Sequence, residues 1–227
     1  MSKWIKTKEQ VLHAALEIHR MGFNSGLSGN ISARIEGEQE LIAITPRGKH
    51  YATLSINDIL VIDKHGDTVE GDLVPSSESL VHISIYKARL DIGCIIHAHP
   101  IYATAAAVAN LVIPPIVDEM VISLGGSIQV AQYAFPSTQE LADNAVTALS
   151  NRNAVLLRNH GLVVTGNNMD RAVNNCELSE RVAHVFLLSH SLGKDLELPA
   201  EIVQIEKEIS VSYTHLRAHE TDSYLVC

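Results

Sequence analysis

The sequence has few cysteines and no long apolar run. The three cysteines, Cys94, Cys176 and Cys227, are widely spaced and odd in number, so they predict neither a disulfide framework nor a zinc site built from thiolates. No stretch approaches the about 18 apolar residues of a membrane helix, and the N-terminal MSKWIKTKEQ lacks the apolar core of a signal peptide. We therefore expect a protein of the reducing cytoplasm that does not enter a membrane.

Runs of basic residues are also absent. The chain has 17 Lys and Arg against 26 Asp and Glu, which gives a net charge of -9. Nucleic acids and anionic membranes are bound through clustered basic side chains. We expect neither as a partner, and an anionic substrate must be bound by a few local groups.

The chain has no internal repeat and no linker rich in Pro, Gly or Ser. With 227 residues, 46% of them hydrophobic, it can bury one substantial core. We expect one domain over residues 1–210. The last residues, 211–227, change abruptly in character, and their first part resembles a translated sequencing adapter. We interpret this tail as an artefact that contributes nothing to fold or function.

Hydrophobic periodicity predicts helices separated by short strands. The first helix is expected to begin at a capping box formed by Thr7 and Gln10 and to end near Gly22. Short strands joined by turns favour antiparallel pairing, so the pattern indicates an α/β domain in which helices cover a largely antiparallel sheet. The expected helices span residues 7–22, 76–90, 101–110, 137–150 and 168–192, and the expected strands 30–35, 41–45, 59–63, 93–99, 128–130, 154–158 and 162–165.

Three histidines and one glutamate are candidates for a metal site. His97 and His99 are two residues apart on a predicted strand, where side chains project to the same face. His160 occupies a turn between two apolar strands, and Glu78 follows two serines where a helix is expected. Three imidazoles and a carboxylate suit tetrahedral zinc. The remaining histidines considered show no comparable spacing, and we assign them no role: His13, His19, His50, His65, His82, His184 and His190.

Five segments carry a resemblance to a known family. PSSESLVH, GCIIHAHPIYATAAAV and LLRNHG, together with GLSGNISAR and ITPRGKHY, resemble in order and spacing the class II aldolase and adducin-head family, most closely its L-fuculose-1-phosphate aldolases. The resemblance implies a three-layer α/β/α sandwich with a mostly antiparallel central sheet, and a homotetramer with sites near subunit boundaries. It also implies zinc as the cofactor, held by Glu78, His97, His99 and His160.

The implied activity is reversible cleavage of an L-fuculose-1-phosphate-like ketose 1-phosphate to dihydroxyacetone phosphate and an aldehyde. A Lewis-acidic metal stabilises the enediolate, and Glu78 is expected to leave the metal when substrate binds and to act as general base. The predicted strands contain no lysine, which disfavours a Schiff-base mechanism. The phosphate ligands implied by the family are Asn30, Gly48, Ser76 and Ser77. The two serines also stand at a predicted helix start, where they could bind an anion or simply cap the helix.

Two departures from the family pattern leave alternatives open. Asp118 or Glu119 occupies the region of a tyrosine that acts as an acid in the fuculose enzymes, and a carboxyl could replace it only with a raised pKa. Glutamate acts as base there in methylthioribulose-1-phosphate dehydratases, so Glu119 is a second catalytic candidate and a dehydratase an alternative function. A second alternative function is that of a 4-epimerase resembling the L-ribulose-5-phosphate enzyme. A non-catalytic scaffold like the adducin head is disfavoured, because such a scaffold lacks the metal ligands that are present here. Arg47, in place of a threonine, could pair with phosphate or face solvent.

Overall fold

A computed structural model describes residues 2–194 and 197–209. The helices are α1 (Ile5–Arg20), α2 (Ser79–Ala88), α3 (Ile101–Ala109), α4 (Asp118–Leu124), α5 (Gln139–Leu149) and α6 (Met169–Ser191), with short 3-10 helices η1 (Tyr51–Thr53) and η2 (Ile56–Asp58). Residues 200–209 are also helical. The interpretation of residues 211–227 as an artefactual tail concerns a segment outside the described residues.

The strands form one mixed sheet. They are β1 (Asn30–Ile35), β2 (Glu38–Ile44), β3 (Leu60–Asp63), β4 (Thr68–Glu70), β5 (Cys94–Ala98), β6 (Gln129–Ala131), β7 (Ala154–Leu157) and β8 (Gly161–Gly166). Their order is β4-β3-β2-β1-β5-β8-β7-β6. Only the β6–β7 pair is parallel among these strands. The predicted, mostly antiparallel sheet is therefore confirmed.

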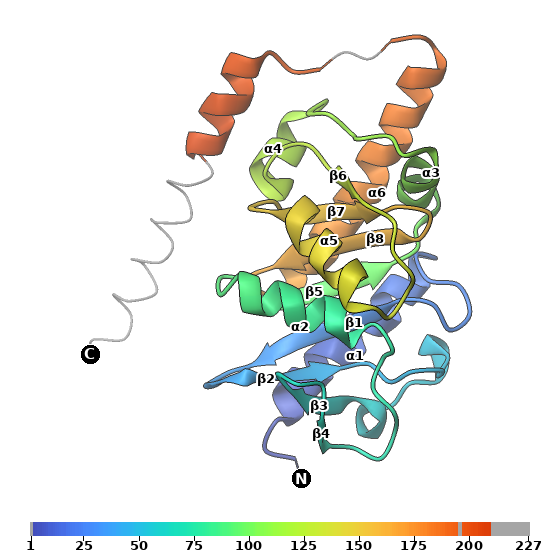
Figure 1. Ribbon diagram of the computed structural model, residues 1–227, viewed down its shortest axis with the longest axis vertical. Helices are drawn as coiled ribbons and strands as arrows, with labels where there is room; N and C mark the ends of the chain where they lie inside the picture. Colours follow the sequence, from blue (N-terminus) through green and yellow to red (C-terminus); the bar gives the residue numbers. More distant parts are fainter. Residues whose placement is uncertain (1, 195–196, 210–227) are drawn as a thin grey trace.

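Helices cover both faces of the sheet, which confirms the three-layer architecture. On one face, α2 and α5 bury a core that includes Ile95 of β5 and Val163 of β8, and Figure 1 shows these two helices in front of the strands. On the other face, α1, α3, α4 and α6 pack against residues such as Ile96 and Leu162. Because alternate strand residues point to opposite faces, β5 supplies apolar side chains to both cores and is buried along its whole length.

The structure corrects the predicted helix starts. No capping box is present at Thr7, because α1 already begins at Ile5 and Thr7 lies inside its first turn, packed away from solvent. The predicted end is confirmed, since Gly22 follows the C-cap Met21 with a positive φ of 76°. Helix α2 begins at Ser79 and not at position 76.

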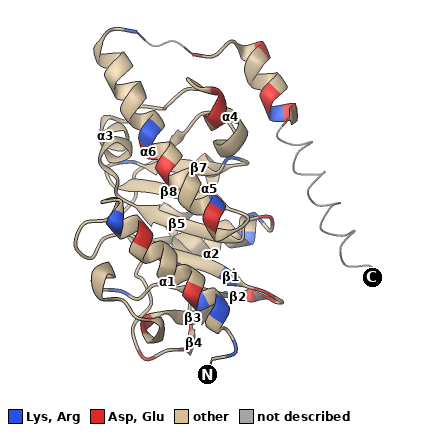
Figure 2. Ribbon diagram, turned by 180° about the vertical axis from the view of Figure 1, so that it is seen from behind, with Lys and Arg blue, Asp and Glu red and all other residues tan. Residues whose placement is uncertain are grey.

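Among the labelled strands and α-helices, two were not predicted. The short strand β4 pairs with β3 at the sheet edge, and α4 forms in a segment that was expected to be irregular. Both are too short for their hydrophobic period to be distinctive. Within the described residues no helix is both long and apolar enough to cross a membrane. Figure 2 shows acidic and basic residues interspersed along α1 and α6.

Candidate metal centre

Strand β5 delivers two histidines to the centre of the molecule. His97 lies on the strand opposite Asn30 of β1 and Val163 of β8, and His99 follows the strand directly. The backbone N–H of His99 donates to the carbonyl oxygen of Phe23 at 2.9 Å, which holds the chain extended beyond the strand end. The two rings meet edge to face with centroids 4.7 Å apart, and their Nε2 atoms are separated by 2.9 Å. The shared face predicted for His97 and His99 is therefore present.

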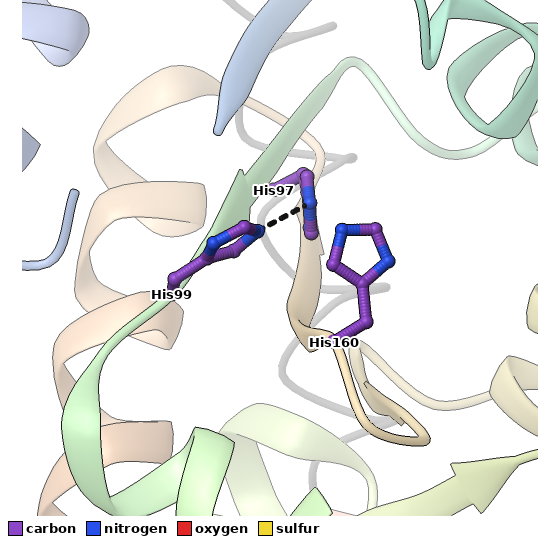
Figure 3. A group of neighbouring side chains, drawn as sticks. All are labelled: His97, His99 and His160. Carbon is purple, nitrogen blue, oxygen red and sulfur yellow. Dashed lines mark hydrogen bonds between the residues drawn. The ribbon is translucent and has the colours of Figure 1, made fainter. Parts of the chain in front are cut away.

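The β7–β8 turn brings in the third histidine. Asn159 has a positive φ of 56°, and the N–H of His160 donates to the carbonyl of Leu157 at 3.0 Å. A Cβ on Gly161 would lie 2.6 Å from the His99 ring and 2.7 Å from the carbonyl oxygen of Ala98, so only glycine lets this turn approach β5 closely. Figure 3 shows the three imidazoles facing one another, and one nitrogen of each lies within 4.8 Å of the others.

Glu78 closes the cluster from the opposite layer. It is the N-cap of α2, and its carboxylate oxygens contact two of the histidines. Oε2 lies 3.1 Å from His97 Nε2, and Oε1 lies 3.3 Å from His160 Nε2. The carboxylate is largely buried, with 11% of the side chain exposed. The structure thus brings together all four residues that the sequence predicts as metal ligands.

Hydrogen bonding prepares His97 to offer a lone pair. Its Nδ1 lies 2.9 Å from the carbonyl oxygen of Leu162, which can only accept, so Nδ1 carries the proton and donates it. This bond orients the ring and directs Nε2 toward the other histidines. In metal sites, the ring nitrogen of a histidine that does not bind the metal usually donates its N–H to a group such as a backbone carbonyl.

The charges of the cluster favour a cation at its centre. Burial opposes ionisation of Glu78, but attraction to His97 and His160 outweighs it and holds the pKa of the Glu78 carboxyl well below its ordinary value. Burial lowers the pKa of His99 to about 3 and that of His160 to about 4, and His97 adds to both shifts. Burial also disfavours charge on His97, yet Glu78 raises the pKa of that imidazole. A proton and a metal ion therefore compete for the space between the His97 imidazole and the Glu78 carboxylate.

The donor set fits a metal ion. Oε1 of Glu78 is buried and accepts no hydrogen bond from the described residues, although a buried carboxylate oxygen is costly without a donor or a cation. Neutral imidazoles and a carboxylate are ligands suited to divalent transition metals. The cluster can therefore hold a metal ion and, in Glu78, a group able to accept a proton.

Three of the four residues predicted to bind phosphate lie on two adjoining loops. Pro46 bridges to Pro75, and the N–H of Arg47 donates to the carbonyl of Val74 at 2.9 Å, so the loop carrying Gly48 adjoins the one carrying Ser76 and Ser77. Gly48 and Ser77 are exposed. Ser76 is buried, and its hydroxyl accepts from the N–H of Glu78 at 3.3 Å. The serines precede α2, which corrects the prediction that they stand at the helix start.

Asn30 and Arg47 are the remaining candidates for phosphate binding, and their surroundings differ from each other. The Asn30 amide is buried and donates to Glu78 Oε2 at 3.1 Å, so this amide group points to the carboxylate. Arg47 is exposed. Its role as a phosphate partner is untested.

Glu119 lies in the first turn of α4, outside the histidine cluster. Its carboxylate forms an exposed ion pair with Arg181 of α6. Asp118 precedes it on the same helix and interacts with Glu206, whose pKa is raised by burial and by this neighbouring carboxyl. The structure does not bring Glu119 to the metal ligands, and its catalytic role remains a prediction.

Sequence reasoning missed two residues that support the cluster. Asn24 is buried, and its Oδ1 accepts from the N–H of His99 at 3.4 Å. His82 is fully buried and contacts Asn30. A signal for His82 was available, because it stands four residues after Glu78 and so on the same helix face. No sequence spacing identifies Asn24.

A mostly antiparallel sheet lies between helical layers, and three histidines and a carboxylate converge beside its central strand. These features define an α/β protein with a site suited to a metal ion. The sequence matches the family model "Class II Aldolase and Adducin N-terminal domain" over residues 9–187. The chain belongs to this family, as its motifs indicated.

Individual relatives are sugar-phosphate aldolases. The L-fuculose phosphate aldolase of Escherichia coli (strain K12) is 36% identical over 182 residues, which cover 80% of this chain and 83% of that protein. The 5-deoxy-D-ribulose 1-phosphate aldolase of Bacillus thuringiensis serovar kurstaki is 32% identical over 196 residues, covering 86% and 91%. A solved L-fuculose 1-phosphate aldolase superposes with a TM-score of 0.86 at 35% identity and covers 92% of this chain and 96% of its own.

Proposed function

We propose that this protein is a zinc-dependent aldolase that reversibly cleaves a ketose 1-phosphate to dihydroxyacetone phosphate and an aldehyde. The zinc ligands are His97, His99, His160 and, in the resting enzyme, Glu78. The observation that carries the proposal is the position of the Glu78 carboxylate, 3.1 Å from His97 Nε2 and 3.3 Å from His160 Nε2. One site thus combines metal ligands with a group that can accept a proton.

Each residue has a distinct task in this proposal. Zinc held by the three imidazoles would act as a Lewis acid that stabilises negative charge on the substrate's oxygens during carbon–carbon cleavage. Glu78 accepts and returns the substrate's proton through a carboxylate oxygen. His97 stays oriented through its bond to the Leu162 carbonyl. Gly48, Ser76 and Ser77 form a phosphate site at the two adjoining loops, with Ser77 offering an exposed hydroxyl.

The relatives support this reaction type and leave the sugar open. One relative is an L-fuculose phosphate aldolase and another a 5-deoxy-D-ribulose 1-phosphate aldolase. We propose an L-fuculose-1-phosphate-like ketose as substrate and a cytoplasmic homotetramer as the working assembly. Exposed apolar side chains suited to subunit contacts include Leu90, Ile101 and Phe135.

The decisive test is Glu78→Gln. An amide fills the same space but cannot accept the proton, so we expect turnover to fall by about 10²–10⁴-fold, the usual worth of a general base. The fold should be retained. The assay incubates purified protein with zinc, dihydroxyacetone phosphate and a panel of aldehydes, and measures the ketose 1-phosphates that form. Cleavage of the same ketose 1-phosphates is then measured in the reverse direction. Glu140→Gln, an exposed position on α5, is the matched control.

Water loss from ketose 1-phosphates should be measured in the same samples. Dehydration without aldol cleavage, abolished by Glu119→Gln and not by Glu78→Gln, would replace the aldolase proposal with a dehydratase. The exposed ion pair of Glu119 with Arg181 gives no support to that alternative.

A further inference from the structure

A line of buried hydrogen bonds leads from the middle of the sheet to the Glu78 carboxylate. Asn30 Nδ2 donates to Glu78 Oε2 at 3.1 Å, Asn30 Oδ1 lies 2.5 Å from His82 Nε2, and His82 Nδ1 lies 2.6 Å from Ser32 Oγ. Asn30 and Ser32 share a face of β1 because they are two residues apart. Glu78 and His82 share a face of α2 because they are four apart.

Only one set of donor directions is compatible with these contacts. The carboxylate can only accept, so Asn30 must present its Nδ2 to Glu78 and its Oδ1 to His82. His82 Nε2 must then carry a proton. Burial lowers the pKa of His82 to about 3, so the ring is neutral and Nδ1 must accept. The hydroxyl that donates to Nδ1 is that of Ser32.

Burial leaves these groups no alternative partners in solvent. Ser32 and His82 have 0% of their surface exposed, and Asn30 has 3%. A proton on His82 Nδ1 would place two lone pairs against each other at the 2.5 Å contact with Asn30. The amide would have to flip, and the 3.1 Å contact with Glu78 would then join two oxygens. By donating to Nδ1, the Ser32 hydroxyl therefore holds the ring in the one arrangement that lets the Asn30 amide donate to the carboxylate.

We propose that Ser32 and His82 are positioning residues for Glu78, which they control by fixing the orientation of the Asn30 amide. The inference rests on the proposed role of Glu78 as general base. Asn30 holds Oε2, so that Oε1, the oxygen without a donor, is the one left for the reaction. The network also gives Asn30 a task other than binding phosphate.

The adjacent Tyr86 provides a matched control. Its hydroxyl lies 2.9 Å from Ser32 Oγ, and Tyr86 is buried, with 4% of its surface exposed. With Ser32 donating to His82, the Ser32 oxygen can only accept from Tyr86, whose hydroxyl also lies 3.4 Å from the Gly93 carbonyl oxygen. Removing the Tyr86 hydroxyl deletes its contacts with Ser32 and with the Gly93 carbonyl but leaves the Ser32 proton free to face His82.

The first experiment reads the tautomer of His82 directly. Long-range ¹H–¹⁵N correlation spectra of the full-length protein distinguish protonated from unprotonated ring nitrogens, and the His82 signals are identified by their loss in His82→Gln. We expect a neutral ring with its proton on Nε2. A proton on Nδ1 would overturn the proposal, and this test requires no enzymatic activity.

The second experiment compares Ser32→Ala with Tyr86→Phe. Both should lower the unfolding midpoint, because each removes a buried hydroxyl. Only Ser32→Ala should leave His82 Nδ1 without a donor, which releases the ring from its fixed position against Asn30, shifts the ¹⁵N signal of Nδ1 and reduces kcat, by roughly 10- to 100-fold as for other supporting partners of a metal site, with KM unchanged. If Ser32→Ala does not fold, Ser32→Cys replaces it, since a thiol is a weak donor of similar size.

The outcomes separate this inference from the proposed function. Equal kcat losses in Ser32→Ala and Tyr86→Phe would mean a purely structural role and end the proposal, as would full kcat in Ser32→Ala. In the Glu78→Gln background, Ser32→Ala should cause no further loss, because both changes act through one group. Full activity of Glu78→Gln itself would instead refute the assignment of Glu78 as base.

Discussion

At the scale of single residues, His97 has the most constrained environment in the cluster. Its Nδ1 donates to Leu162, its Nε2 lies beside both His99 and Glu78, and only 2% of its side chain is exposed. No other side chain of the described cluster contacts two of its other members and is also this deeply buried. We infer that a metal ion held here depends on His97 more than on its neighbours.

We predict that His97→Ala abolishes metal binding. Supporting partners of a metal site are worth about 10–100-fold in affinity, so loss of a direct ligand should weaken zinc binding by more than roughly 100-fold. Elemental analysis and competition with a chromogenic chelator measure this. His65→Ala, at an exposed turn, should bind zinc like the original chain. Full zinc occupancy in folded His97→Ala would refute the ligand assignment.

At the scale of secondary structure, the N-terminus of α2 joins two parts of the site. Glu78 is its N-cap and faces the histidines, whereas Ser76 and Ser77 lie just before it, beside the loop of Gly48. Because Ser76 accepts from the Glu78 N–H, it shapes the turn in addition to any contact with substrate. Ser77 is exposed and has no such structural bond to lose among the described residues.

We predict that Ser77→Ala weakens phosphorylated substrates and leaves unphosphorylated analogues unaffected. Loss of a hydrogen bond to a charged group should cost on the order of 1.5–3 kcal/mol in kcat/KM. Ser76→Ala should also weaken phosphorylated substrates more than unphosphorylated ones. In addition, kcat/KM should fall slightly with both kinds of substrate, because the turn that carries Glu78 is loosened. Ser84→Ala, farther along α2, is the control. Equal losses of Ser77→Ala with both substrates would exclude phosphate binding by this serine.

At the scale of the whole molecule, the sheet order assembles the site from four distant segments. Strands β1, β5 and β8 are neighbours in the order β4-β3-β2-β1-β5-β8-β7-β6, so Asn30 and His97 lie side by side although 67 positions separate them. Helix α2 crosses the same face and adds Glu78. The buried residues of the two cores that hold these layers range from Val11 to Phe186.

We predict that deletion of residues 211–227 leaves folding and zinc binding intact, because the described core and all four candidate ligands precede them. Thermal unfolding and zinc content measure this. The control is a longer truncation that ends the chain before Cys176. This truncation removes Leu178, Val182 and Phe186 from the core, so the shortened chain should not fold. Loss of folding after the shorter deletion would contradict the one-domain boundary near residue 210.

The sequence by itself determined the identity of the candidate ligands and the type of sheet. Period-2 and period-3.6 patterns depend on local chemistry, so most strands and long helices could be predicted, and the spacing of His97 and His99 already implied a common face. Short elements such as α4 have too few residues for a distinctive period. The start of α2 at Ser79 could not be read locally, because Ser76 and Ser77 form a turn held by the bridge from Pro46 to Pro75.

Only the tertiary structure decided which partners the buried polar groups have. The amide of Asn30 is committed to Glu78 and His82, and Glu119 to Arg181, and each of these pairs joins residues far apart in the chain. A buried donor must find an acceptor wherever the fold provides one, and the direction of each bond depends on what lies at the far end of the network. Local sequence therefore names the reactive groups, whereas packing across the sheet determines how they are oriented.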